Sequence, residues 1–158
     1  MNVALPTPAD TDRLGRQLAQ ALAVHAQGAV VTLAGELGAG KTALARATIQ
    51  ALGHTGPVVS PSYTLIEPYD LPGRRLHHLD LYRLGDPEEL EFLGIRDICI
   101  EADLVLVEWA DRGAGFLPAP DIDITLEYRG EGRSAHLQAH SAAGRRVVAT
   151  LYEFRSRT

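Results

Sequence analysis

The sequence is poor in cysteine, in long apolar runs and in net positive charge. Its 158 residues include one cysteine, Cys99, so neither an internal disulfide bond nor a cysteine-cluster metal site is expected. The longest strand-like apolar run, residues 104–107, is far shorter than the roughly eighteen residues of a membrane span. Twenty acidic residues against fifteen basic ones give a net charge of −5, which argues against a protein that coats polyanions with a basic stripe.

The start of the chain also lacks the basic region and the apolar stretch of a signal peptide. Apolar residues make up 46% of the sequence, which is enough to bury a core, and the length fits one compact domain. We therefore expect a single domain over residues 1–158, located in the cytoplasm and without contact to a membrane.

Lysine is almost absent. Fourteen of the fifteen basic residues are arginine, and Lys41 is the only lysine. A genome-wide codon bias would also produce this excess of arginine. Guanine-selecting GTPases carry an Asn/Thr-Lys-x-Asp element, which this chain cannot contain because its one lysine belongs to a different motif. The composition therefore favours ATP over GTP as a nucleotide.

A glycine-rich motif surrounds this lysine. Its residues are Gly35, Glu36, Leu37, Gly38, Ala39, Gly40, Lys41 and Thr42, which match the spacing of a P-loop. Glycines let backbone N–H groups converge on phosphate oxygens, and the positive end of the following helix points at the same anion. We expect Lys41 to contact the β- and γ-phosphates and the Thr42 hydroxyl to ligate Mg²⁺. A wide arginine fork does not fit such a closed loop, so the one lysine stands where arginine has the wrong shape.

The predicted elements alternate between strands and helices, as in an α/β fold. Leucines at positions 14, 18 and 22 predict an amphipathic helix over residues 10–23. A β-branched run predicts a buried strand at 29–34 before the P-loop, and a helix is predicted at 43–52 after it. The other predictions are strands at 65–69, 75–81 and 104–108, a turn at 70–73, a short helix from Asp86 to near Gly94, and an antiparallel hairpin of 122–128 and 135–139. Residues from 141 onward fit either a helix or a strand.

Acidic residues end two of the predicted strands. Glu108 follows four apolar residues, which is the position of the second acid that holds Mg²⁺ or orients water in nucleoside triphosphatases. Asp80 ends the strand that contains two histidines. Ligands collect at the carboxyl ends of parallel strands, so the P-loop favours a functional role for both acids over simple solvent exposure.

Four other features have alternative interpretations. His77 and His78 lie on opposite faces of a strand, so we do not expect them to share a metal. The segment 60–63 (Ser-Pro-Ser-Tyr) is either an ordinary turn or a source of hydroxyls that sense phosphate. Trp109 either packs in the core or contacts the nucleotide. Four arginines near the C-terminus either form a solvated tail or contact RNA or an acidic partner weakly; they are Arg145, Arg146, Arg155 and Arg157.

These motifs, taken in order and spacing, resemble the bacterial TsaE (YjeE) family. They are the P-loop, Ser60-Pro61-Ser62-Tyr63, His78-Leu79-Asp80-Leu81-Tyr82-Arg83, Glu88-Glu89-Leu90 with Gly94-Ile95, and Val107-Glu108-Trp109. Thr11-x-x-Leu14-Gly15 and Gly132-Arg133 extend the resemblance over nearly the whole chain. A P-loop alone is unspecific, whereas this series of motifs is highly specific.

The resemblance implies a small, Mg-dependent P-loop ATPase. It implies a P-loop NTPase-like α/β fold, with a mainly parallel sheet, added antiparallel strands and flanking helices. The family works with TsaB and TsaD to form N6-threonylcarbamoyladenosine in tRNAs that read ANN codons. TsaD transfers the threonylcarbamoyl group, and the TsaE-like subunit binds the TsaB–TsaD complex and hydrolyses ATP, slowly alone and faster with its partners, to reset the complex.

The resemblance also implies a set of site residues. Catalytic roles fall to Lys41, Asp80 and Glu108, and Mg²⁺ ligation to Thr42, Glu108 and Asp80. Nucleotide binding is implied for Thr11, Glu36, Leu37, Gly38, Ala39, Gly40, Lys41, Thr42, Ala43, Ser62, Trp109 and Arg133, with Thr11 and Arg133 on the base and ribose side. Ser62 replaces the threonine of the family pattern, so a hydroxyl remains but the methyl that restricts its rotamer is missing.

Two alternatives from other classes stay open at this point. A P-loop small-molecule kinase would also combine a P-loop with scattered arginines, but it needs an arginine-bearing lid, and no long insertion in the sequence supplies one. A nucleotide-dependent scaffold with little turnover would need the same phosphate site. The sequence does not distinguish direct from indirect tRNA contact.

Overall fold

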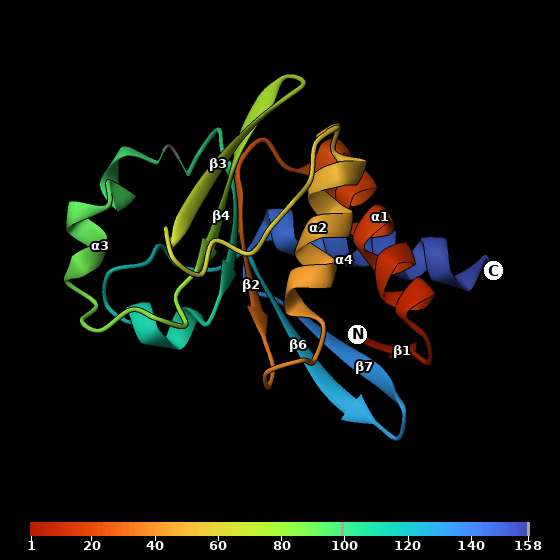
Figure 1. Ribbon diagram of the computed structural model, residues 1–158. Coiled ribbons are helices and arrows are strands. Elements are labelled where there is room, and N and C mark those ends of the chain that lie inside the picture. Colours follow the sequence, from red (N-terminus) through yellow and green to blue (C-terminus); the bar gives the residue numbers. More distant parts are fainter. Residues whose placement is uncertain (99, 158) are drawn as a thin grey trace.

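A computed structural model describes residues 1–98 and 100–157. Seven strands form one sheet in the order β1-β7-β6-β2-β5-β4-β3, with helices on both sides (Figure 1). Cys99, on which the exclusion of a disulfide bond rests, lies outside the described residues. No helix in the described part of the chain combines the length and the apolar character needed to cross a membrane.

The strands in the middle of the sheet are parallel, and those at its two ends are antiparallel. β2 pairs in parallel with β5 and β6, and β4 pairs in parallel with β5. Hairpins add β3 next to β4 and β7 next to β6, and β1 completes the sheet beside β7. The strands are β1 (Asn2–Leu5), β2 (Ala29–Ala34), β3 (Ile66–Leu71), β4 (Arg74–Asp80), β5 (Leu104–Glu108), β6 (Ile122–Arg129) and β7 (Gly132–Ala139). The predicted P-loop NTPase-like α/β fold, with antiparallel strands added to a parallel sheet, is confirmed.

Three long helices cover one face of the sheet, and short helices lie against the other (Figure 1). The helices are α1 (Pro8–His25), α2 (Lys41–Ala51), α3 (Glu89–Phe92) and α4 (Ala142–Ser156), with short 3₁₀ helices η1 (Ile95–Asp97) and η2 (Ala110–Gly113). In β2, Val31 and Leu33 join the apolar cluster under α1, α2 and α4, whereas Val30 joins the cluster under α3. Burial on both faces explains why this strand reads as a continuous apolar run.

Helix α1 packs closely against α2 because Gly15 has no side chain. A Cβ atom at Gly15 would lie 2.5 Å from the Cβ of Ala47 in α2. The same packing brings Thr11 onto the P-loop, since its methyl group lies 3.9 Å from the position that a Cβ of Gly40 would take. The motif that joins Thr11 to Gly15 thus sets how α1 approaches the phosphate loop.

The C-terminal segment, which the sequence left undecided, is helix α4. Its cap residue Ser141 accepts a hydrogen bond from the backbone N–H of Gly144 at 3.0 Å, and Val147 and Leu151 are buried in the core. The interpretation of this region as a solvated tail is therefore wrong for Arg155, which donates to Gln17 Oε1 of α1 at 3.1 Å. The segment was too short for its apolar spacing to decide between helix and strand.

Smaller differences arise at element boundaries. Strand β1 was not predicted, because four residues are too few to show alternation, and this strand forms through its antiparallel pairing with β7. Helix α3 begins at Glu89 instead of Asp86, since the Asp86 carboxylate accepts from Glu88 N at 3.0 Å and forms a turn first. The predicted turn between β3 and β4 narrows to the residues between Leu71 and Arg74.

Candidate functional site

The P-loop connects the carboxyl end of β2 to the first residue of α2. Gly35, Gly38 and Gly40 have positive φ angles of 146°, 81° and 106°, which disfavour residues with side chains. A Cβ at Gly35 would also lie 2.6 Å from the carbonyl oxygen of Leu126 in β6. The glycines are therefore required by both backbone conformation and close packing, and the loop exposes its N–H groups at the start of a helix.

Lys41 lies inside this loop and is 6% exposed. Its ammonium group donates to the carbonyl oxygens of Gly35 and Glu36, the latter at 3.0 Å, and lies 4.3 Å from the ring centroid of Trp109. Burial lowers the pKa of Lys41, and the nearby carboxylates of Glu108 and Asp80 oppose this shift. A compact cation is thus held at the place where the loop N–H groups would meet phosphate.

Glu108 at the end of β5 contacts the residue that follows the lysine. The Thr42 hydroxyl donates to Glu108 Oε1 at 2.9 Å, and His78 Nε2 lies 2.6 Å from Glu108 Oε2. The parallel pairing of β2 with β5 produces this contact by placing Glu108 opposite Leu33, near the start of the P-loop. Glu108 is only 2% exposed, and each of its carboxylate oxygens contacts a protein group.

Asp80 is the strand-register neighbour of Glu108 on β4. Its two oxygens accept hydrogen bonds from the Ser60 hydroxyl at 2.6 Å and from the backbone N–H of Tyr82 at 3.1 Å. Ser60, and not Ser62, is therefore the serine that contacts this acid, whereas Ser62 lines the same cavity as Asp80. Both acids thus lie at the ends of neighbouring parallel strands, where the sequence pattern had placed them.

Trp109 closes this region from the side of η2. Its backbone is left-handed, with a φ of 57°, which turns the chain directly after Glu108. Its ring lies 5.0 Å from the Tyr82 ring, and the Arg112 guanidinium lies 4.9 Å from Tyr82 and 5.5 Å from Trp109. Trp109 therefore lies next to the Lys41 ammonium group, the Tyr82 ring and the Arg112 guanidinium group.

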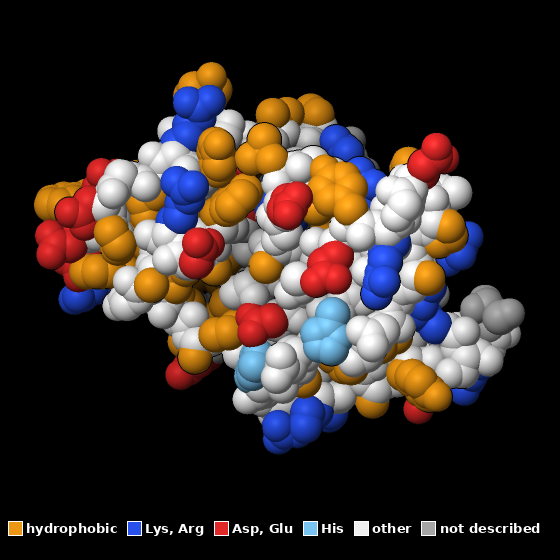
Figure 2. All heavy atoms as spheres, turned by 90° about the horizontal axis from the view of Figure 1, so that it is seen from below, with side chains coloured by type: hydrophobic (Ala, Val, Ile, Leu, Met, Phe, Trp, Pro, Cys, Tyr) orange, Lys and Arg blue, Asp and Glu red, His pale blue; other side chains and the backbone are white. Residues whose placement is uncertain are grey.

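Around these residues lies a cavity of about 310 Å³, which we call the P-loop cavity. It is lined by Leu37, Gly38, Gly40, Lys41, Thr42, Ala43, Ser62, Asp80, Tyr82, Arg83, Glu108 and Trp109. The structure thus gathers the lysine, the hydroxyl and both strand-end acids around one space. Figure 2 views the molecule from the end at which β2 and β6 finish, and on this face acidic and basic side chains are interspersed.

A second cavity, of about 230 Å³, adjoins the first and is called the hairpin cavity here. It shares Gly38, Gly40 and Ala43 with the P-loop cavity and is closed by Thr11 and Arg133. The other lining residues are Leu5, Pro6, Thr7, Pro8, Ala39, Glu131 and Gly132. The predicted residues therefore fall into two groups on either side of the P-loop glycines.

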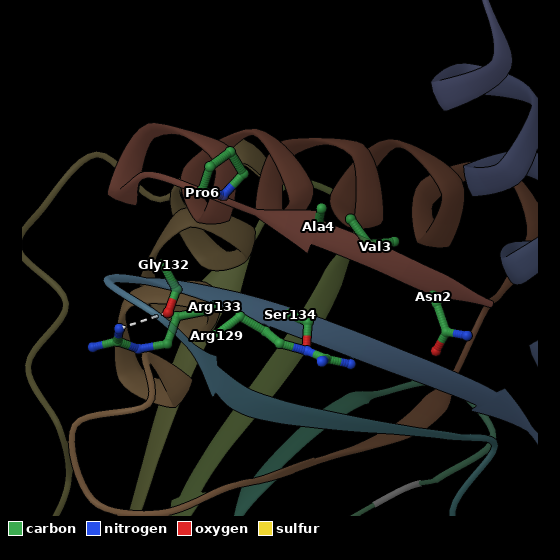
Figure 3. Close-up of a pocket in the computed structure, with 8 residues that line it drawn as sticks. All are labelled: Asn2, Val3, Ala4, Pro6, Arg129, Gly132, Arg133 and Ser134. Carbon is green, nitrogen blue, oxygen red and sulfur yellow. Dashed lines mark hydrogen bonds between the residues drawn. The ribbon is translucent and has the colours of Figure 1, made fainter.

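Arg133 links the β6–β7 hairpin to the P-loop. It donates to the Gly38 carbonyl at 3.2 Å, and its guanidinium lies 4.0 Å from the Tyr128 ring, whose hydroxyl donates to the Leu37 carbonyl at 2.8 Å. Arg133 also borders a hollow of about 670 Å³, which is lined by β1 and by residues of the β6–β7 hairpin (Figure 3). There, Arg129 extends along the sheet toward Ser134, whereas Arg133 turns the other way.

Of the predicted residues, only Glu36 lines neither of these two cavities; its carbonyl oxygen contacts Lys41. The sequence predicted no functional role for His78 or Arg83, and for Ser60 it offered only the alternative that the hydroxyls of segment 60–63 sense phosphate. Ser60 and His78 bind the two strand-end acids, and Arg83 lines the P-loop cavity with its guanidinium 4.5 Å from the Tyr63 ring. All three belong to the motifs that carry the family resemblance, which was the available signal.

A parallel sheet, a P-loop between β2 and α2, and a strand-end acid hydrogen-bonded to the residue after the lysine define the P-loop nucleoside triphosphatase fold. A family model described as threonylcarbamoyl adenosine biosynthesis protein TsaE matches residues 5–135. The chain therefore belongs to the TsaE family, which confirms the resemblance seen in the sequence.

Relatives and a solved structure agree with this assignment. A protein of Haemophilus influenzae named tRNA threonylcarbamoyladenosine biosynthesis protein TsaE is 44% identical over 88% of this chain and 89% of its own length. A protein of the same name from Nostoc sp. is 38% identical over 78% of each chain. The crystal structure of Bacillus subtilis YdiB aligns with a TM-score of 0.81 and 26% identity, over 98% of this chain and 95% of that chain.

Proposed function

We propose that this protein binds and hydrolyses ATP as a subunit required, with TsaB and TsaD, to form N6-threonylcarbamoyladenosine in tRNAs that read ANN codons. The observation that carries the ATPase proposal is the hydrogen bond between Thr42 and Glu108 beside the buried Lys41. The names of the relatives, which place them in tRNA threonylcarbamoyladenosine biosynthesis, support the pathway.

In this proposal the nucleotide lies across both cavities. The loop N–H groups from Gly38 to Thr42 bind the phosphates, and Lys41 balances the charge on the terminal ones. The hairpin cavity takes the ribose and adenine between Thr11 and Arg133. The residues that both cavities share, Gly38, Gly40 and Ala43, have no side chain larger than a methyl group, so one elongated ligand fits across both parts.

The residues at the P-loop fit a magnesium ion. Mg²⁺ prefers oxygen ligands and is bound by one or two carboxylates together with substrate phosphates. Thr42, Glu108 and Asp80 supply oxygens around one cavity. Among the described residues, no group of three or more histidine, cysteine or acidic side chains is arranged to hold a metal ion by itself. Bound there, the ion would neutralise charge on the phosphates.

Catalysis in this proposal rests on Lys41, Glu108 and Asp80. Lys41 stabilises charge on the transferred phosphoryl group, and Glu108 holds the metal side of the site together with Thr42. Asp80, whose oxygens are oriented by Ser60 and the Tyr82 N–H, supports the metal or the attacking water. Trp109 packs over Lys41 and limits its movement.

The partners and the location are part of the proposal. We place the protein in the cytoplasm with the TsaB–TsaD complex as its main partner. Acidic and basic groups alternate on the face that carries the strand ends (Figure 2), so a weak or indirect tRNA contact suits this surface better than extensive coating of RNA.

The experiment combines phosphate release with tRNA modification. The purified protein is assayed with ATP and Mg²⁺, alone and with TsaB and TsaD, beside a Lys41→Ala variant. We expect slow release by the protein alone, faster release with both partners, none in Lys41→Ala, and modified tRNA only when the active protein is present.

Other outcomes would favour other functions. ATP consumption in proportion to a phosphorylated metabolite would identify a small-molecule kinase. Full tRNA modification with a non-hydrolysing Glu108→Ala variant that still binds the partners would identify a nucleotide-dependent scaffold. Binding of neither TsaB nor TsaD would contradict the proposed assembly.

A further inference from the structure

His78 lies in β4 and is fully buried. Among the described residues, Glu108 is the one hydrogen-bond partner of its side chain. The exposed fraction of His78 is 0%, and Nε2 lies 2.6 Å from Glu108 Oε2. Its other ring nitrogen, Nδ1, is buried and has no hydrogen-bond partner among the described residues. Because carboxylate oxygens only accept hydrogen bonds, Nε2 is the ring nitrogen that carries a proton toward Glu108.

A histidine at this position is not explained by packing. Its register partner on β5 is Leu106, and its neighbour two residues back on the same face is Leu76, which is fully buried. A buried polar group with an unsatisfied atom costs free energy compared with an aliphatic side chain that fits the same space. The benefit of the histidine must therefore lie in its one contact.

That contact completes a clamp on the carboxylate of Glu108. Thr42 holds Oε1 from the P-loop, and His78 holds Oε2 from the interior of the sheet. The last torsion of a glutamate side chain is broad when nothing restrains it. With donors on both sides, the carboxylate has one orientation, in which Oε1 faces the P-loop.

We propose that His78 is a positioning residue that orients Glu108 for metal-assisted nucleotide binding. This inference rests on the proposed ATPase function. It concerns how the carboxylate of Glu108 is oriented before magnesium and nucleotide bind. Groups that orient a metal-binding carboxylate from behind contribute about 10–100-fold to metal affinity or activity. His78 acts through Glu108 and touches neither the nucleotide nor the reacting atoms.

The adjacent histidine provides a matched control. His77 is also buried, but it faces the other side of the sheet, where Nε2 lies 2.9 Å from Asp103 Oδ2. A His77→Leu variant thus removes a partly buried histidine–carboxylate contact from the same strand without touching Glu108. Any effect of removing a histidine from β4 in general will appear in both variants.

The experiment measures metal-dependent binding, which does not require turnover. Calorimetry with adenylyl imidodiphosphate, with and without Mg²⁺, gives the gain in affinity that the metal produces. We expect His78→Leu to reduce this gain by about 10-fold or more, with unchanged affinity in the absence of Mg²⁺. His78→Gln, whose amide nitrogen reaches the Nε2 position, should restore most of the gain, whereas the shorter His78→Asn should not. His77→Leu should match the natural protein.

Two results would overturn the inference: an unchanged metal gain in His78→Leu, or equal losses in the Gln and Asn variants. If His78→Leu does not fold, the difference between His78→Gln and His78→Asn carries the test, with unfolding midpoints as the check on folding. Absence of ATP hydrolysis in the natural protein would count against the proposed ATPase function, whereas these binding measurements decide the role of His78 separately.

Discussion

The two cavities that meet at the P-loop are built in different ways. In the P-loop cavity three charged groups come from strand ends and the helix start, and they are almost fully buried: Lys41 is 6% exposed, Asp80 5% and Glu108 2%. The fourth charged group, Arg83, is exposed and lies in a turn. The hairpin cavity is made from the chain before α1, the start of α1 and the tip of the β6–β7 hairpin. Its one cation, Arg133, contacts carbonyl oxygens near the surface.

This difference corresponds to the two tasks that the proposed function assigns to the cavities. Parallel strands fix the positions of buried charges to within a hydrogen bond, as transition-state stabilisation requires. In the proposed function, the turns and the hairpin supply the shape and the backbone contacts that bind the nucleoside. Substitutions in the P-loop cavity should therefore reduce turnover, whereas those in the hairpin cavity should reduce nucleotide affinity with little effect on turnover.

The largest effect is expected for Lys41→Arg. The substitution keeps the charge but puts a planar fork where the ammonium contacts the Gly35 and Glu36 carbonyls, so we expect turnover to fall by about 1000-fold. Phosphate release from ATP measures it. Arg46→Lys, on the exposed side of the same helix, is the reverse exchange and should be silent. Retained activity in Lys41→Arg would show that charge matters there and shape does not.

Asp80→Asn should have the next largest effect. The amide can keep the contacts with Ser60 and the Tyr82 N–H, so the fold is preserved while the negative charge is lost. We expect turnover to fall by about 100-fold, with unchanged affinity for ATP in the absence of metal. Single-turnover kinetics and nucleotide binding measure the two separately. Loss of affinity without loss of turnover would reverse the division of labour between the cavities.

Gly15→Ala tests the support of the hairpin cavity. The new Cβ would meet Ala47 at 2.5 Å, so α1 must move away from α2 and carry Thr11 away from the P-loop. Overpacking of this kind costs about 1–3 kcal/mol of unfolding free energy, which urea denaturation measures. Gln20→Ala, on the exposed side of α1, is the control. A double variant with Ala47→Gly should lose less stability than the two single changes combined; full additivity would contradict the proposed clash.

Arg133→Gln should produce a smaller effect, confined to affinity. The change removes the contact with the Gly38 carbonyl and the stacking on Tyr128. Contacts of this kind near a surface contribute about 0.5–1 kcal/mol, so we expect KM for ATP to rise a few-fold and kcat to stay constant. Arg129→Gln is the matched control, because that side chain turns away along the sheet (Figure 3). Equal effects of both variants would mean that only the overall charge matters.

The same comparison explains what the sequence could predict. The P-loop cavity follows from local patterns, namely a glycine motif and acids at the ends of apolar strands, and these patterns indicated Lys41, Thr42, Asp80 and Glu108. The contacts that orient these groups could not be predicted from local patterns. His78 reaches Glu108 only through the register of β4 with β5, and Ser60 reaches Asp80 from the loop that precedes β3.

The hairpin cavity depends on contacts between distant parts of the chain. Thr11 and Arg133 are separated by most of the sequence and meet the P-loop only after α1 packs on α2 and β7 folds back on β6. Their assignment to the nucleotide site came from the family resemblance and not from any local pattern. Strand β1 was missed for the same reason, because its identity depends on its pairing with β7.

The smallest expected effect concerns the start of α1, where Thr7 forms part of the hairpin cavity. The Thr7 side chain and backbone N–H donate to the Asp10 carboxylate at 2.7 and 2.9 Å, and these hydrogen bonds lower the pKa of Asp10. A carboxyl whose pKa is lower in the folded state stabilises the fold above its unfolded-state pKa, and this contribution is lost as pH falls through the folded-state value.

Asp10→Ala should therefore reduce stability at neutral pH, and the difference from the natural protein should shrink below about pH 4. Urea midpoints at several pH values measure it. Thr7→Val removes the hydroxyl donor but keeps the N–H donor. The pH dependence of its stability should therefore lie between those of the natural protein and Asp10→Ala. If the natural protein and Asp10→Ala lose stability in parallel as pH falls, the carboxylate does not anchor this wall of the hairpin cavity, and the wall must be held by the packing of α1 on α2 alone.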